Sequence, residues 1–116
     1  MFIYQLKIKI KPYKPEEFLK SVGSFLPNIR KHKGCVCYSV YRDSETKNTY
    51  SLIGEWKTRK ALEEHFQTND FEVLIGSAKV LGETFAMNIS KTLKTGGFDL
   101  ARKQIVSAKT KEAAAD

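Results

Sequence analysis

The sequence predicts a single α+β domain with the ferredoxin-like order strand, helix, strand, strand, helix, strand. Two kinds of periodicity favour this fold class. Four segments alternate apolar and polar residues as a half-buried strand does, and segments between them repeat apolar residues at helical spacing. The chain has 116 residues, of which 41% are hydrophobic and 28% charged, and this composition is typical of one globular domain.

The first strand is predicted over residues 2–10, where apolar side chains occupy every even position. Pro12 and Pro15 end this strand and open a helix that reaches toward residue 31. Because proline lacks a backbone N–H, Pro27 is expected to kink the helix or end it early. The helix carries one apolar stripe, formed by Phe18, Val22, Phe25, Leu26 and Ile29.

The second and third strands are predicted over residues 35–42 and 49–56, with Gly34 as the turn before them and the polar turn 43–48 between them. Strict alternation puts cysteine and valine side chains of the second strand on opposite faces. One face then carries Val36, Tyr38 and Val40, and the other carries Cys35, Cys37, Ser39 and Tyr41.

A helix is predicted over residues 58–67, with Ala61, Leu62, His65 and Phe66 on one side. Asn69, followed three residues later by Glu72, resembles a capping box that starts a further helix through about residue 79. Gly82 ends that helix, and the fourth strand follows over residues 83–90. Residues 1–92 therefore form the predicted domain, and residues 93–116 form a C-terminal tail with a weak helical stripe and an alanine-rich end that should fray.

The two faces of the predicted sheet differ in character. The side chains on one face are large and apolar, and the helices are expected to cover them. The other face is small and semi-polar, with Gln5, Lys7, Cys35, Cys37 and Ile53 among its side chains. Such a face is most economically covered by the same face of a second copy, so the sequence predicts a homodimer with two-fold symmetry.

Charge and cysteine usage bound the environment of the protein. The net charge of +7 comes from the two ends, since residues 34–90 carry six Lys/Arg against eight Asp/Glu. Solvated lysines explain this balance as well as a nucleic-acid partner does. No apolar run approaches the roughly 20 residues that cross a bilayer, and no signal-peptide pattern opens the chain. We therefore expect a cytoplasmic protein without a membrane partner, with both cysteines reduced.

Four stretches together resemble the antibiotic biosynthesis monooxygenase family: residues 34–43 (GCVCYSVYRD), 51–56 (SLIGEW), 61–66 (ALEEHF), and Phe71 with the apolar run after it. The useful markers are the glycine before the second strand, the tryptophan that closes the third, and the histidine nine residues later. The resemblance covers roughly residues 1–92. It implies a dimeric α/β barrel built from two ferredoxin-like protomers, similar to quinol monooxygenases.

The resemblance further implies a cofactor-independent oxygenase that acts on a quinol or polyphenol. Such chemistry needs a base, a dry pocket for an aromatic ring, and hydrogen-bond donors to developing oxyanions. His65 is the expected catalytic base, because its spacing from Ala61 and Leu62 turns it toward the sheet and imidazole titrates near neutrality. A structural core or interface histidine is the alternative. The expected substrate-binding side chains are Tyr4, Tyr38, Tyr50, Trp56, Phe66 and Met87. Ordinary packing in the core is the favoured alternative for most of them, and Trp56 would then wedge the second helix against the sheet.

The sequence also departs from the family. Many relatives have a glutamate two residues before the tryptophan, whereas this chain has Gly54 there and its acid at Glu55. Glu55 is expected on the dimer face, and Gly54 is expected to widen the pocket. Haem-degrading relatives have a tryptophan at the position of His65 and a histidine at the position of Ile75. They also have an asparagine in the first strand, where this chain has Leu6. The resemblance therefore implies neither haem nor another cofactor.

Two rival functions follow from single motifs. Residues 33–41 faintly echo the strand motif of RNA-binding domains, but cysteines stand where aromatic side chains would stack on bases, so we expect no nucleic acid partner. His32, Cys35 and Cys37 suggest a metal site. A structural zinc site needs four ligands, and His65 is expected to face the opposite side of the sheet, so no metal is predicted.

A non-oxygenase member of the same fold is the main alternative. Such a dimer would bind a small hydrophobic ligand, either as a binding module or as an isomerase or cyclase. Binding of an aromatic ligand at His65 without turnover would favour this alternative.

Overall fold

The computed structural model describes residues 1–112 and confirms the predicted α+β, ferredoxin-like order of elements. A short helix and a longer one together connect the third and fourth strands, and a final helix follows the fold. The elements are β1 Phe2–Ile10, α1 Pro15–Ile29, β2 Cys35–Arg42, β3 Thr49–Trp56, α2 Arg59–Phe66, α3 Asn69–Leu81, β4 Gly82–Lys91 and α4 Phe98–Glu112.

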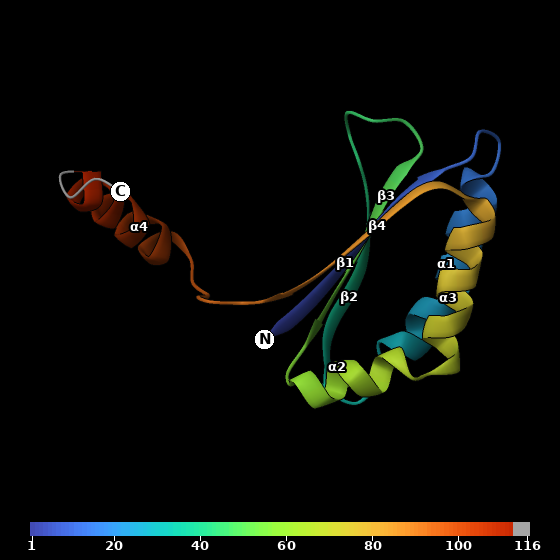
Figure 1. Cartoon of the computed structure of the whole chain (residues 1–116), viewed down its shortest axis with the longest axis horizontal. Helices are drawn as coiled ribbons and strands as arrows, with labels where there is room; N and C mark the ends of the chain where they lie inside the picture. The colour runs from blue at the N-terminus through green and yellow to red at the C-terminus, as the bar shows by residue number, and fades with distance from the viewer. Residues whose placement is uncertain (113–116) are drawn as a thin grey trace.

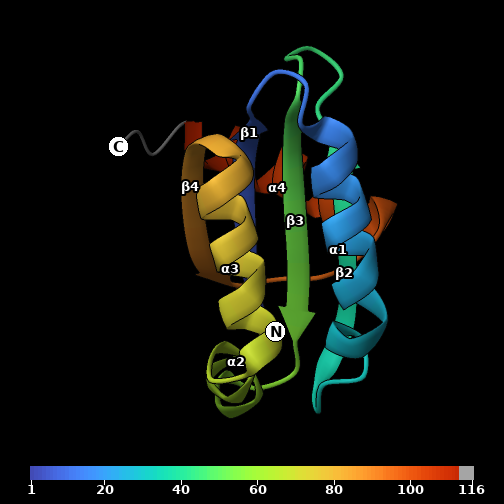
Figure 2. The same ribbon diagram turned by 90° about the vertical axis from the view of Figure 1, so that its right-hand side faces the viewer.

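The four strands form one antiparallel sheet in the order β2-β3-β1-β4. Helices α1, α2 and α3 lie on one side of this sheet, and none of them lies on the other (Figures 1 and 2). Within one protomer the sheet is open and does not close into a barrel. The core therefore sits between the sheet and α1–α3, where the buried apolar residues form one cluster.

Two helix boundaries differ from the prediction, each for a local reason. Pro27 lies inside α1, and the helix ends only two residues later, at Ile29, short of the predicted residue 31. Few backbone bonds remain to be lost at that point. The cap of α3 is Thr68 and not Asn69, since the Thr68 hydroxyl accepts a hydrogen bond from the backbone N–H of Phe71 at 3.2 Å. Gly82 ends α3 as predicted.

A β-bulge in β2 corrects the predicted faces of that strand. Cys35 pairs with Trp56 and Cys37 pairs with Glu55, so one extra residue stands between the two pairs. The bulge removes strict alternation. Cys35 therefore packs against the core on the helix-covered face, while Val36 is 40% exposed. Cys37, Ser39 and Tyr41 lie on the open face as predicted.

The helices cover the middle of the sheet better than its edges. Tyr4, Leu6 and Leu52 of the two central strands are fully buried. On the edge strand β4, Phe85 and Ile89 share the helix-covered face but are 46% and 58% exposed. The prediction that the helices bury all apolar residues of this face is therefore wrong at the edge strands.

The C-terminal tail forms the helix α4, which projects away from the sheet on the side opposite α1 and α3 (Figure 1). Three of its large apolar side chains are solvent-exposed, namely Phe98 at 90%, Ile105 at 57% and Val106 at 60%. The alanine-rich end predicted to fray lies outside the described residues. Over the described residues 1–112, none of the helices combines the length and apolarity that crossing a membrane requires.

Candidate active site

His65 belongs to α2, and its side chain is buried between this helix and the sheet. Helix α2 starts at Thr58, whose hydroxyl accepts a hydrogen bond from the backbone N–H of Ala61. From that start, helical spacing turns Ala61, Leu62 and His65 onto one buried face. The side chain of His65 points toward the sheet as predicted, and the residue is only 1% exposed.

A continuous chain of hydrogen bonds runs through His65. On one side, His65 Nε2 lies 2.7 Å from the hydroxyl of Tyr4, which donates to the Tyr38 hydroxyl at 2.8 Å. On the other side, His65 Nδ1 lies 2.8 Å from His32 Nδ1. His32 Nε2 in turn lies 3.0 Å from the Asp70 carboxylate. Five side chains from separate parts of the sequence thus form one polar path through the core.

Two complete arrangements of protons satisfy this chain, and they differ by one proton. With Tyr4 donating to Tyr38, His65 Nε2 donates to Tyr4, and His65 Nδ1 accepts from His32, which then carries a proton on each nitrogen. When the hydroxyls turn round, Tyr38 donates to Tyr4, Tyr4 to His65, and His65 to His32. His32 then keeps one proton, on the nitrogen facing Asp70. The path can therefore store one proton without breaking a hydrogen bond.

Burial sets the acid–base character of these groups. Desolvation lowers the pKa of His65 to about 4, with a further lowering by charge on His32 and an opposing effect of Asp70. Desolvation also raises the pKa of Tyr4 far above its ordinary value and that of Tyr38 to about 12. At neutral pH both tyrosines are phenols, and His65 is a neutral imidazole with one nitrogen able to accept a proton.

Aromatic rings enclose His65. The Trp56 ring stacks on the imidazole with centroids 4.3 Å apart, and the Phe71 ring meets it edge-on at 5.3 Å. The indole Nε1 of Trp56 is buried, and within the described residues it has no hydrogen-bond partner. Because buried N–H groups are nearly always paired, this donor is suited to an oxygen atom of a bound molecule.

The structure brings together four of the six predicted substrate-binding side chains. Tyr4, Tyr38, Trp56 and Phe66 surround His65, with the Phe66 ring 5.3 Å from the Tyr4 ring and 5.9 Å from the imidazole. The remaining two lie elsewhere, and these are Tyr50 and Met87.

The positions of those two residues have simple causes. Tyr50 lies six residues from Trp56 along β3, which places it roughly 20 Å away, where its ring packs on Phe18 at 5.4 Å. Met87 lies beside Leu6 on the edge strand and is half-buried against the core. Tyr50 and Met87 share a face of the sheet with Trp56 and Tyr4, but they lie at other positions along the strands. Sharing a face was therefore not enough to bring them to His65.

His32 and Asp70 are the site residues that sequence reasoning missed. The expectation that His65 faces away from His32 is wrong, because the loop after α1 folds back and places the two imidazole rings 5.0 Å apart. Asp70 sits in the first turn of α3. One signal was present, since the two histidines of the chain and an acid five residues after the second are the ordinary ingredients of an imidazole relay. Within the described residues, no cluster of three or more His, Cys, Asp or Glu side chains is arranged to hold a metal ion.

Gly54 does not widen a pocket as expected. It lies between Tyr4 and Tyr38 in the sheet, and a Cβ atom there would come within 2.6 Å of the Tyr38 ring. The missing side chain is thus what lets the two tyrosine hydroxyls meet. Glu55 lies on the open face as predicted, where it accepts a hydrogen bond from Cys37 Sγ at 3.0 Å. This bond raises the pKa of the Cys37 thiol to about 11.

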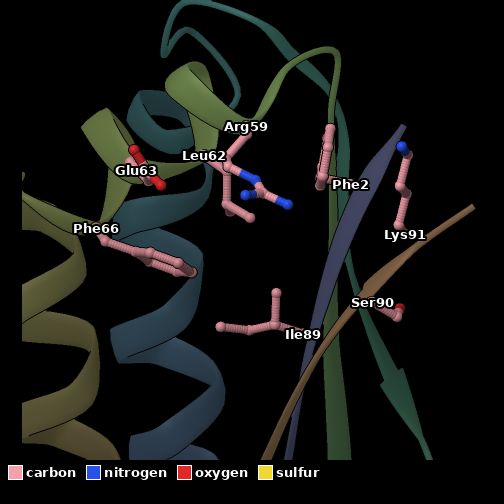
Figure 3. Close-up of a pocket in the computed structure, with 8 residues that line it drawn as sticks. All are labelled: Phe2, Arg59, Leu62, Glu63, Phe66, Ile89, Ser90 and Lys91. Carbon is pink, nitrogen blue, oxygen red and sulfur yellow. The ribbon is translucent and has the colours of Figure 1, made fainter.

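A pocket of about 370 Å³ opens next to this cluster, between α2 and the β1–β4 edge (Figure 3). Its wall includes Leu62 and Phe66, the two residues of α2 that flank His65. Two cations lie near the Phe2 ring, Arg59 on α2 and Lys91 at the end of β4, each within 6 Å of the ring centroid. The remaining lining residues are Glu63, Ile89 and Ser90. Phe66 both lines this pocket and packs its ring 5.3 Å from the Tyr4 ring and 5.9 Å from the His65 ring.

The fold and the site define a small ferredoxin-like protein with a neutral histidine buried among tyrosine and tryptophan side chains. The family model of antibiotic biosynthesis monooxygenases matches residues 1–75. The chain therefore belongs to the antibiotic biosynthesis monooxygenase family.

Individual relatives agree with this assignment. An uncharacterized protein of Synechocystis, sll1783, is 36% identical over 89 residues, which are 76% of this chain and 60% of that protein. The chain thus spans under two thirds of that relative. The Bacillus subtilis protein YcnE, which carries a provisional monooxygenase name, is 31% identical over 70% of this chain and 85% of its own. Among solved structures, SnoaB from Streptomyces nogalater, a cofactor-independent oxygenase, matches with a TM-score of 0.72 over 81% of this chain and 94% of its own, at 16% identity.

Proposed function

We propose that this protein is a cofactor-independent monooxygenase that oxidises a quinol or another polyphenolic aromatic with O2. The observation that carries the proposal is the buried path from Tyr4 through His65, with its neutral imidazole. A phenol becomes a good electron donor to O2 once it loses its proton, so this chemistry needs a base in a dry site. Membership of the monooxygenase family supports the proposal.

The reaction balances without another reactant. The phenolic proton leaves to the protein, and the phenolate gives electrons to O2. One oxygen atom then bonds to a ring carbon, while the C–H bond of that carbon breaks. The other oxygen atom leaves as water, with the hydrogen of that carbon and a proton equivalent to the one taken from the phenol. The product is the corresponding quinone. The protein supplies a base, a shaped site and donors to the developing oxyanions.

The pocket in Figure 3 is the proposed site of the aromatic ring. Its apolar side chains, Phe2, Leu62 and Phe66, suit the faces of a planar ring. A rotation of Phe66 would join this pocket to the Tyr4 hydroxyl. The unpartnered indole N–H of Trp56 is then the donor proposed to stabilise the oxyanion.

Transfer of the phenolic proton to His65 alone would cost free energy. A phenol has an ordinary pKa of about 10, and the pKa of His65 is about 4. Six units correspond to ~8 kcal/mol against transfer to His65 as an isolated acceptor. The base therefore works only if the positive charge is stabilised beyond His65 itself.

Oxygen uptake by the purified protein, freed of metal and flavin, tests the proposal against hydroquinones, naphthalenediols and anthrones. Wild type is expected to consume O2 with one member of this panel. His65→Ala and Tyr4→Phe are expected to lose at least 10²-fold in kcat, the lower end of what a general base contributes. The matched control is Tyr41→Phe, which alters an exposed tyrosine on the same sheet and should keep wild-type activity. Equal turnover by His65→Ala and wild type would refute the role of His65.

A second function rests on the complete burial of the same residues. Tyr4 and His65 are at most 1% exposed, so the site as it stands is closed to a substrate. A non-oxygenase protein that binds a small hydrophobic ligand in the adjacent pocket would have this property. Calorimetric titration with the same aromatics separates the two functions, because binding without oxygen uptake would favour the binding module.

A further inference from the structure

We propose that His32 and Asp70 are positioning residues of this site, and that His32 is the place where the substrate proton is stored during turnover. The inference rests on the proposed function for its chemistry. It concerns the far end of the hydrogen-bonded path, for which neither the family match nor the relatives assign a role. Its geometry stands independently of any substrate.

The contacts make His32 the natural end of the path. His32 faces His65 with one ring nitrogen, at 2.8 Å, and the Asp70 carboxylate with the other, at 3.0 Å. An imidazolium on His32 would therefore point one N–H at a carboxylate and the other at a neutral imidazole. Charge-assisted hydrogen bonds of this kind are about twice as strong as neutral ones.

Exposure also favours a charge on His32 over one on His65. The His32 and Asp70 side chains keep 17% and 29% of their surface exposed, whereas His65 is 1% exposed. A cation is penalised by burial and stabilised by a nearby carboxylate. The titratable groups that face the two imidazoles are Tyr4 from β1, Tyr38 from β2 and Asp70 from α3. Among these groups Asp70 is the carboxylic acid, and its Oδ2 lies 3.0 Å from His32 Nε2.

Proton movement along the path conserves every bond type. The substrate O–H breaks and its proton bonds to Tyr4 Oη, while the Tyr4 proton moves to His65 Nε2. The proton on His65 Nδ1 then moves to His32 Nδ1. The substrate becomes a phenolate, His65 ends neutral with its proton on the other nitrogen, and the positive charge lies on His32 beside Asp70. Release of a proton from His32 to solvent then returns the path to its original number of protons.

This arrangement makes a prediction for the protein without substrate. As the pH falls and His32 takes up its second proton, the proton on His65 must shift from Nδ1 to Nε2 while His65 stays neutral. Imidazole ¹⁵N NMR of the full-length protein distinguishes these forms directly. We expect the His65 tautomer to change over the same pH range in which His32 takes up its second proton. In His32→Gln, the His65 tautomer is expected to stay the same over that range.

The contrary NMR result is equally plain. If His65 keeps one tautomer while His32 titrates, the two imidazoles do not share a proton and the inference fails. Lys31→Gln is the control, because it changes an exposed neighbour of His32 without touching the path. Since this experiment needs no substrate, its outcome is independent of whether the protein is an oxygenase.

Kinetics provide the second test once a substrate is found. His32→Gln and Asp70→Asn are expected to lower kcat at least 10-fold with little change in KM, and Asp70→Glu should recover part of it. At low pH, His32 that is already protonated cannot accept the substrate proton, so kcat should fall in the wild type. This acid limb of the kcat–pH profile should vanish in His32→Gln. A merely structural pair would lower the folded fraction but leave the limb in place. Wild-type kcat and an unchanged profile in both variants would overturn the inference.

Discussion

The two faces of one sheet have opposite designs in this protein. On the helix-covered face, the central residues Tyr4, Leu6 and Leu52 are fully buried, and the Tyr4 hydroxyl is hydrogen-bonded to Tyr38 and His65. On the open face, their neighbours in sequence, such as Gln5 and Ile53, are partly exposed, and in the described residues no helix packs on them (Figure 1). Helices of this chain cover one face, and none of the described residues forms a helix that covers the other (Figures 1 and 2).

The difference follows from the alternation of side chains along a strand, which sends neighbouring residues to opposite faces. Each residue on the covered face contributes to folding or to the candidate site, whereas its neighbour contributes almost nothing to the core of the protomer. We propose that a second copy covers the open face, as a semi-polar face with a central isoleucine suits a self-complementary contact. Folding and assembly should then be separable by mutating adjacent positions.

A pair of substitutions at neighbouring residues of β3 tests whether the covered face serves folding and the open face serves assembly. Leu52→Ala is expected to lower the free energy of unfolding by about 2–5 kcal/mol, because it removes a fully buried side chain. Ile53→Lys is expected to leave the protomer folded but to dissociate the proposed dimer, because it places an unpaired charge in the contact. Denaturant unfolding and analytical ultracentrifugation measure the two effects. A stable dimer of Ile53→Lys would contradict the assignment of the open face.

The fold was predictable because it rests on local periodicity. The alternation in residues 2–10 and the stripe in α1 each describe one element, and Gly82 marks a helix end by its own chemistry. The errors lie where neighbours in space decide. The bulge at Cys35 depends on how β2 meets β3, and the exposure of Ile89 depends on where the helices end over the sheet.

The candidate site was predictable only in part for the same reason. His65 could be placed because helical spacing sets its direction. His32 could not, because it lies in a loop whose path depends on tertiary contacts, and Asp70 joins it from a third segment. The role of Gly54 was also beyond the sequence, since the space above it is filled by a ring from the neighbouring strand.

Burial of the His65 imidazole on the covered face should make the stability of the fold depend on pH. His65 has a folded-state pKa of about 4, below the value of about 6.5 expected in the unfolded chain. The unfolded state therefore binds more protons between these values, so stability falls as the pH falls through this range, by about 3 kcal/mol in total. Urea unfolding at pH 7 and pH 5 should show a steeper loss for wild type than for His65→Gln. Parallel losses would mean that His65 is not kept neutral by burial.

The smallest effect separates a glycine of the covered face from one at the surface. Gly54→Ala is expected to cost about 1–3 kcal/mol, because its Cβ would lie 2.6 Å from the ring of the buried Tyr38, which has nowhere to move. Gly23→Ala in α1 meets no atom within 4 Å and should instead stabilise the helix by about 0.5–1 kcal/mol. Both changes restrict the unfolded chain alike, so thermal unfolding of the pair isolates the collision with Tyr38. Equal melting temperatures would show that Tyr38 can yield, and that the contact of the two tyrosine hydroxyls does not depend on glycine at position 54.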